Sequence, residues 1–273
     1  MAATRPVVFC SDYGLTDPFV GICHGVIARI APDARILDLT HGIPPMDVLG
    51  GAAMLSAAVR YMPDDAVYLA VVDPGVGTAR RPLVVETADG QFLVGPDNGV
   101  LSLAWEQLGG VKRAVEITAR GVILEPTSHT FHGRDVFAPA AAHLAKGLDL
   151  DALGPAIDVE TLERIDLPRP QIVDGEVRCR VLSIDRFGNV QLAAVEGDLA
   201  GAGLDAETDL VLDTDEVGAI GLLRARTFDG VAPGQAALIV DSAGWLAAAF
   251  NGGNLAEALR IRPGDPVLIR RIQ

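Results

Sequence analysis

The stretch VYLAVVDPGVGTARRPL (67–83) places a carboxylate and two cations around a glycine-rich loop. An apolar run ends near Asp73, a loop of Pro and Gly follows, and Arg80 stands on its far side. A carboxylate beside a guanidinium can accept a proton or orient a water molecule. A phosphate cradle is the other chemistry that glycines after a strand suggest, but the spacing matches neither GxxxxGK[ST] nor GxGxxG and no Lys follows. We therefore do not expect phosphate here.

Polar residues also follow the two preceding apolar runs. The first run ends in SDYG, with Asp12, and leads to Asp17; the second ends at Thr40–His41. Ligands of open α/β sheets bind beyond the carboxyl ends of parallel strands, which share one edge. Each of these residues alone is commonly a turn or cap residue, and Asp17 is a candidate N-cap for the next helix, with Pro18 in its first turn. The whole set, with Asp73, predicts a site.

The stretch SHTFHGRDVF (128–137) is the next concentration of polar residues. Asp135 is a candidate N-cap for the helix that follows. His129 and His132 are three residues apart, but they precede the helix and have no carboxylate at a metal-ligand spacing. We therefore predict no metal. On this pattern alone, His132 is open between a catalytic and a structural role.

Two stretches further on combine aromatic or amide side chains with glycine. In SIDRFGNVQL (183–192), Phe187 could stack on a flat ligand while Asp185 and Asn189 form hydrogen bonds. The Asn251–Gly252 turn could bring backbone amides close to a heterocycle. The alternatives are a hairpin turn in the first case and ordinary core packing in the second.

Short apolar runs alternate with helical patterns in the first half of the chain, which predicts an α/β fold with a mainly parallel sheet. PLVVETADGQFLVGPDNG (82–99) instead predicts a hairpin with Asp89–Gly90 at its turn. After a proline-containing linker the pattern changes to many short strands. We expect an N-terminal α/β domain over 1–165 and a smaller, antiparallel, barrel-like β domain over 170–273.

Composition narrows the function. The 273 residues are 49% hydrophobic and carry a formal net charge of −14, with no basic cluster beyond short pairs, which argues against nucleic-acid binding. An acidic protein is compatible with a cationic small ligand. The three cysteines have no zinc or disulfide spacing and are expected to be buried in a reducing compartment. Without an apolar run of membrane-spanning length, we expect a cytoplasmic protein and no membrane partner.

Several motifs together resemble one family. They occur in the order SDYGLTDPFVG, VDPGVGTARRPL, GPDNG, TFHGRDVFAPAAAHLA, IDRFGNV and NGGNLAEAL. These stretches resemble the S-adenosyl-L-methionine hydroxide adenosyltransferase family, which is related to fluorinating and chlorinating adenosyl enzymes. The resemblance covers nearly the whole chain. It implies an α/β domain and a β-barrel-like domain, assembled as a homotrimer with the active site between subunits.

The resemblance also implies residue roles. Asp73, Arg80 and His132 match the set that handles the nucleophilic water, and halogenating relatives have an aromatic residue in place of Asp73. The implied substrate-binding residues are Asp12 for the ribose, Asp17, Asp185 and Ser242 for the methionine portion, and Phe187, Asn189, Asn251 and Gly252 for the adenine.

Two positions depart from the relatives. Ala243 stands where they often have an Arg, which puts the methionine carboxylate clamp in doubt. Met46 replaces a Trp found near the ribose in the halogenating members.

The resemblance implies hydrolysis of S-adenosyl-L-methionine to adenosine and L-methionine, with the sulfonium compound as substrate and no cofactor. Water would attack the ribose C5′ in line with the leaving thioether. Either Asp73 or His132 could accept the proton. The alternatives are a halide-dependent adenosyltransferase and a non-catalytic protein that binds the same ligand.

Overall fold

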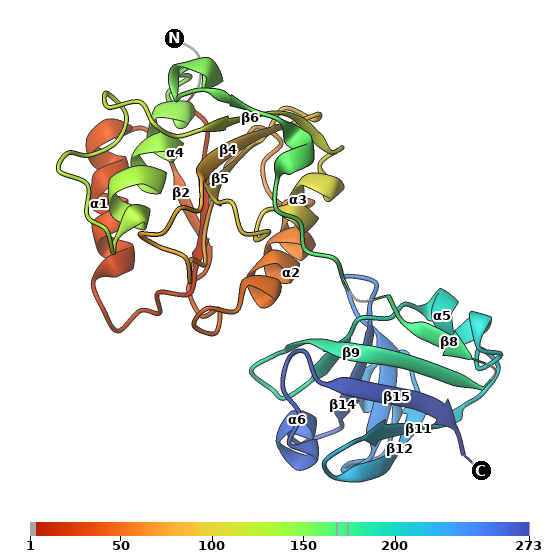
Figure 1. Ribbon diagram of the computed structural model, residues 1–273. Coiled ribbons are helices and arrows are strands. Elements are labelled where there is room, and N and C mark those ends of the chain that lie inside the picture. The colour runs from red at the N-terminus through yellow and green to blue at the C-terminus, as the bar shows by residue number, and fades with distance from the viewer. Residues whose placement is uncertain (1–3, 168, 174, 273) are drawn as a thin grey trace. The chain divides into compact units, whose positions relative to one another are not determined.

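A seven-stranded sheet forms the centre of the first of two units, Met1–Ile165 and Asp166–Gln273, which we describe one at a time. The description rests on a computed structural model and covers residues 4–167, 169–173 and 175–272 (Figure 1). The strands of the first unit are β1 (Val7–Ser11), β2 (Ile36–Thr40), β3 (Val67–Val71), β4 (Pro82–Thr87), β5 (Phe92–Pro96), β6 (Val111–Glu116) and β7 (Ala156–Ile157). Its helices are α1 (Phe19–Ile30), α2 (Val48–Val59), α3 (Ser102–Gln107), a π-helical turn (Gly133–Phe137) and α4 (Ala138–Ala145).

The sheet order is β2-β1-β3-β5-β4-β6-β7, and β2, β1, β3 and β5 are parallel. The carboxyl ends of β1, β2 and β3 therefore lie at one edge. β4 and β5 pair antiparallel around a turn in which Gly90 has φ +95°, as the sequence predicts. The largely parallel α/β fold is confirmed.

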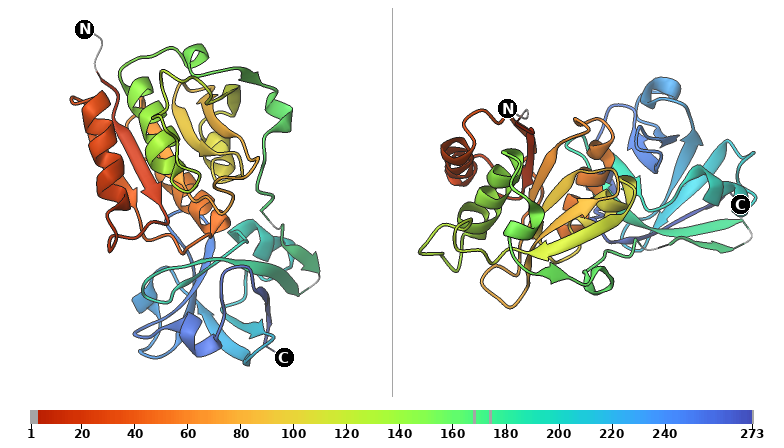
Figure 2. Two further views of the ribbon diagram at one scale, coloured as in Figure 1. Left: turned by 60° about the vertical axis from the view of Figure 1, so that its left-hand side comes forward. Right: turned by 90° about the horizontal axis from the view of Figure 1, so that it is seen from above.

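Helices cover both faces of this sheet. Figures 1 and 2 show α1 and α4 side by side on one face and α2 and α3 on the other. Alternate residues of β1 divide between the two cores: Val7 and Phe9 pack with α1 and α4, while Val8 and Cys10 pack toward α2 and α3. A strand buried on both faces is apolar throughout, which explains its continuous apolar sequence.

The start of α1 differs from the prediction. Pro18, not Asp17, occupies the N-cap position, and no side chain caps the helix. Asp17 is exposed in the bend before it. The expected cap is wrong because the helix begins one residue later, at Phe19, so Asp17 lies outside the first turn.

The second unit is a closed β-barrel. Its strands are β8 (Gln171–Val173), β9 (Glu176–Ile184), β10 (Val190–Leu192), β11 (Asp209–Thr214), β12 (Gly218–Arg224), β13 (Ala236–Val240), β14 (Leu246–Phe250) and β15 (Pro266–Arg271). Two short helices, α5 (Glu196–Gly201) and α6 (Leu255–Leu259), accompany them. The pairing of β10 with both β14 and β9 closes a ring of seven strands, while β8 extends it at β9. All described pairings are antiparallel except β12 with β13, so the predicted antiparallel barrel is confirmed.

All three cysteines are buried and unpaired. Among the described residues, no helix combines the length and the apolar character that crossing a membrane requires.

Candidate active site

Asp73 and Arg80 form a buried ion pair at the strand-end edge of the first unit. Asp73 comes two residues after β3, and the loop returns so that Arg80 Nε donates to Asp73 Oδ1 at 3.0 Å while Nη2 donates to Oδ2. The side chains are only 6% and 9% exposed. The Arg80 guanidinium also lies over the Phe137 ring, with Cζ 5.0 Å from the centroid. Two parallel hydrogen bonds fix the carboxylate in the plane of the guanidinium.

The glycines of the loop serve close packing against another segment. Gly77 has φ +78°, and a Cβ there would lie 2.4 Å from the backbone oxygen of His129. A Cβ at Gly75 would be 3.2 Å from Arg80 Cγ. The loop therefore turns tightly while its backbone touches the segment that carries His132, which only glycine permits at position 77.

His132 joins the ion pair from that second segment. Arg80 Nη2 donates to His132 Nδ1 at 2.7 Å. A guanidinium has no acceptor, so Nδ1 must be unprotonated and the neutral ring carries its proton on Nε2. Burial lowers the pKa of His132, and the positive charge of Arg80 lowers it further. The imidazole is thus held neutral, with an N–H available as a donor.

The segment before α4 is fixed by Asp135, whose predicted role as an N-cap is wrong. Asp135 is 2% exposed and lies inside the π-helical turn. Its carboxylate accepts from Arg134 Nε and Nη2 at 2.6 and 2.8 Å, and from the Ser128 backbone N–H at 2.8 Å. The helical turns begin two residues earlier than the sequence suggests, so this carboxylate closes the preceding loop instead of capping a helix.

Arg80 also has an unpaired donor. Its Nη1 is buried and has no hydrogen-bond partner among the described residues. A buried donor without a hydrogen bond destabilises a protein by about 1–3 kcal/mol, and a charged donor by more. The neighbouring Arg81 differs: it pairs with the buried Asp97 and with Thr161. Adjacent arginines therefore have separate roles, and only Arg80 faces Asp73.

Asp12 follows β1 at the same edge. Its Oδ2 accepts from the backbone N–H of Met46 at 2.9 Å, and Met46 has φ +66°, an uncommon conformation for a residue with a side chain. Asp17, in the bend before α1, is exposed to solvent. Asp12 is thus held at the strand-end edge by a backbone hydrogen bond.

Tyr13 is a site residue that sequence reasoning missed. Its hydroxyl packs over Gly133, where a Cβ would lie 2.0 Å from Oη. Burial raises the pKa of Tyr13, and the nearby carboxylates of Asp12 and Asp73 act in the same direction. The ring contacts Phe131 edge-on, with centroids 5.8 Å apart. Its position directly after Asp12 in the SDYG motif was the available signal.

In the second unit, the residues between β9 and β10 form one tight turn. Asp185 Oδ1 accepts from the backbone N–H groups of Phe187 and Asn189 at 2.8 and 2.9 Å, and Oδ2 accepts from Asn189 Nδ2 at 2.8 Å. Phe187 is 62% exposed. Gly188, with φ +82°, fits against Asn254, whose Oδ1 would lie 2.0 Å from an added Cβ. The turn brings these residues together and leaves Phe187 largely exposed, with the Arg186 guanidinium over its ring and Cζ 5.1 Å from the centroid.

Ser242 and Asn251 lie at opposite ends of β14. Ser242 is exposed in the β13–β14 turn, where Asp241 accepts from the Ala243 and Trp245 backbone N–H groups. Asn251 is fixed at the other end by its Nδ2 donating to Val231 at 2.7 Å. The first and last residues of β14 are about 13 Å apart, because a strand rises by about 3.3 Å per residue. Ser242 and Asn251 are therefore separated by the length of this strand.

These features define the class: a two-unit protein that combines a three-layer α/β fold, a closed β-barrel and a buried Asp–Arg–His group at strand ends. The family models of the SAM hydroxide adenosyltransferase N-terminal and C-terminal domains match residues 7–154 and 179–268. The chain belongs to the SAM hydroxide adenosyltransferase family.

Individual relatives agree with this assignment. A protein of Salinispora tropica named (R)-S-adenosyl-L-methionine hydrolase is 49% identical over 97% of each chain. An Actinoplanes protein named fluorinase is 30% identical, also over 97% of each chain. The crystal structure of an uncharacterized conserved protein from Thermotoga maritima superposes with a TM-score of 0.89 at 34% identity, covering 97% of this chain and 100% of that one.

Proposed function

We propose that this protein hydrolyses S-adenosyl-L-methionine to adenosine and L-methionine. The observation that carries the proposal is the buried Asp73–Arg80–His132 group, in which hydrogen bonds join the three side chains and one Arg80 donor is unpaired among the described residues. The Salinispora relative bears the name of that activity. We infer no cofactor, because the sulfonium is itself an activated leaving group.

In the proposed reaction, a water oxygen attacks the ribose C5′ from the side opposite the C5′–S bond. One C–O bond forms, the C–S bond breaks with its electron pair going to sulfur, and methionine leaves as a neutral thioether. The leaving group needs no acid, so the demands are positioning of the water and removal of one proton.

The hydrogen bonds support a division of labour that the sequence left open. Because Arg80 occupies His132 Nδ1 and the ring proton is on Nε2, His132 is arranged to donate to the water oxygen. The Asp73 carboxylate is then the group that accepts the proton. The unpaired Nη1 of Arg80 supplies a further donor for the developing hydroxide.

The substrate-binding roles remain part of the proposal. Asp12 would hold the ribose hydroxyls, and the exposed Phe187 ring would contact the adenine with Asn189 and the Asn251–Gly252 backbone. Asp17, Asp185 and Ser242 would serve the methionine end. The length of β14 between Ser242 and Asn251 supports an elongated substrate. Asp185 already accepts three hydrogen bonds within its own turn, so it would bind an ammonium only through its remaining lone pairs.

A halide-dependent reaction is the second candidate, because a relative named fluorinase is 30% identical. The Asp73 carboxylate argues against it, because an acceptor for a proton serves a water nucleophile, whereas a halide ion has no proton to lose. We further propose a cytoplasmic homotrimer with its site between subunits, as the family resemblance implies.

The test is chromatography of products after incubation with S-adenosyl-L-methionine, with and without fluoride or chloride. We expect equal amounts of adenosine and methionine under all conditions. A 5′-halogenated nucleoside would favour the second candidate, and binding without turnover would overturn both. Asp73→Asn should lower kcat by about 10²–10⁴-fold, the usual contribution of a positioned base.

A further inference from the structure

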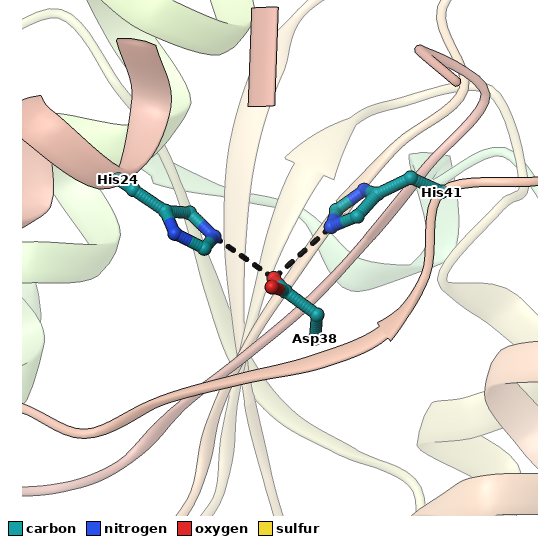
Figure 3. Close-up of side chains that lie close together, drawn as sticks. All are labelled: His24, Asp38 and His41. Carbon is teal, nitrogen blue, oxygen red and sulfur yellow. Dashed lines mark hydrogen bonds and ion pairs between the residues drawn. The ribbon is translucent and has the colours of Figure 1, made fainter. Parts of the chain in front are cut away.

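The side chains of His24, Asp38 and His41 converge at a point that the proposed reaction does not use (Figure 3). His24 belongs to α1, Asp38 to β2, and His41 follows β2. His24 Nε2 lies 2.9 Å and His41 Nε2 3.0 Å from the same oxygen, Asp38 Oδ1. Their sequence spacing gives no hint of this, because the helix–strand packing creates it.

We propose that this group binds a divalent transition-metal ion, of which Zn²⁺ is the reference case. The ligand atoms all lie within 4.8 Å of one another. Tetrahedral Zn²⁺ with bonds of about 2.0–2.1 Å separates its ligand atoms by roughly 3.3–3.4 Å. The ion can therefore enter with small rotations of the three side chains, replacing the two hydrogen bonds to Asp38.

The surroundings of His41 resemble those of a metal-binding histidine. Its side chain is 3% exposed, and its Nδ1 lies 2.8 Å from the buried Ser11 Oγ. A partner at Nδ1 fixes the ring and directs the Nε2 lone pair at the ion, which is the common outer-shell arrangement. Phe9 packs edge-on against the same ring, with centroids 4.6 Å apart. His41 is thus held in place before any ion arrives.

The other two side chains provide access. Asp38 is 42% and His24 33% exposed, so an ion can reach the group from solvent. Two imidazoles and one carboxylate suit Zn²⁺, Co²⁺, Ni²⁺ or Cu²⁺ better than Mg²⁺ or Ca²⁺, which prefer oxygen. Three protein ligands leave a coordination position for water or a solute.

The experiment is calorimetric titration of the untagged, chelator-treated full chain with Zn²⁺ alone, and the visible spectrum with Co²⁺ alone. We expect one equivalent per chain and the absorption of tetrahedral Co²⁺. His24→Ala and Asp38→Asn, which change exposed groups, should each weaken binding at least tenfold. Ser11→Ala should weaken it about 10–100-fold, as loss of an outer-shell partner does. His143→Ala, a histidine of α4 outside the group, is the matched control and should bind as the parent does.

Circular dichroism separates loss of binding from loss of fold for each variant. A parent chain that takes up no Zn²⁺, or correctly folded His24→Ala and Asp38→Asn variants that bind as tightly as the parent, would overturn the proposal. Neither result depends on whether the protein hydrolyses S-adenosyl-L-methionine.

Discussion

Replacing Arg80 by Met should lower the free energy of unfolding of the first unit. The loss should be much larger in the parent protein than in an Asp73→Asn variant. The two side chains are 9% and 6% exposed, so removing the guanidinium leaves a buried carboxylate without its counter-charge. Breaking such a pair costs about 3–5 kcal/mol. At about 2–4 °C per kcal/mol for a unit of this size, Tm should fall by about 6–20 °C.

The double variant removes both charges together. Its loss should be smaller than the sum of the two single losses by about 2–3 kcal/mol, the upper range for side chains in direct contact. About 1 kcal/mol of the loss in the double variant comes from His132 Nδ1, which no longer receives a hydrogen bond.

Urea unfolding followed by tryptophan fluorescence measures this cycle. Trp105 is 1% exposed in the core of the first unit and reports on it directly. Lys112→Met is the control: Lys112 is 59% exposed, its partner Glu86 keeps Arg113, and the expected loss is below about 1 kcal/mol. Additive single losses at Asp73 and Arg80, with unchanged m-values, would refute the buried-pair interpretation.

Three further predictions concern the same unit and its assembly. The pKa of His132 is lowered from 6.5 in the folded state, so its stabilising contribution is present above pH 6.5 and is lost as pH falls through the folded-state pKa. Urea unfolding at a series of pH values measures this loss. The His132→Asn variant should show a flatter dependence of the free energy of unfolding on pH over the same range. Gly77→Ala should lower the free energy of unfolding by more than the about 1–2 kcal/mol expected at a positive φ, because its Cβ meets the His129 backbone, and it should also lower kcat. Gly90→Ala is the control, because Gly90 has φ +95° and open space around it. It should lose only the free energy due to φ and keep the parent kcat. Light scattering after size-exclusion chromatography should give three copies of the chain, and a monomeric, fully active protein would contradict the proposed shared site.

The fold was predictable because the strands and the hairpin turn have recognisable sequence patterns. β1 and β3 are buried on both faces and read as continuous apolar runs, and the Asp89–Gly90 turn marks the β4–β5 hairpin. The helix starts were not predictable to the residue. At Asp17 and Asp135 a good capping residue stands near a helix that begins elsewhere, and tertiary contacts decide the role of Asp135.

The site was predictable only in part. Parallel strands bring Asp12 and Asp73 to one edge, but nothing local relates Arg80 to His132, which are 52 positions apart in the chain. The contact of the Gly77 backbone with His129 brings those two segments together. Tyr13 was missed because its position over Gly133 depends on the same packing.

The central claim is that water is the nucleophile at the ribose C5′. Turnover of S-adenosyl-L-methionine in isotopically labelled water, with mass spectrometry of the adenosine, tests it most directly. The account predicts one labelled oxygen, located at the 5′-hydroxyl, and unlabelled methionine. Adenosine formed without the label, or label in methionine, would contradict it.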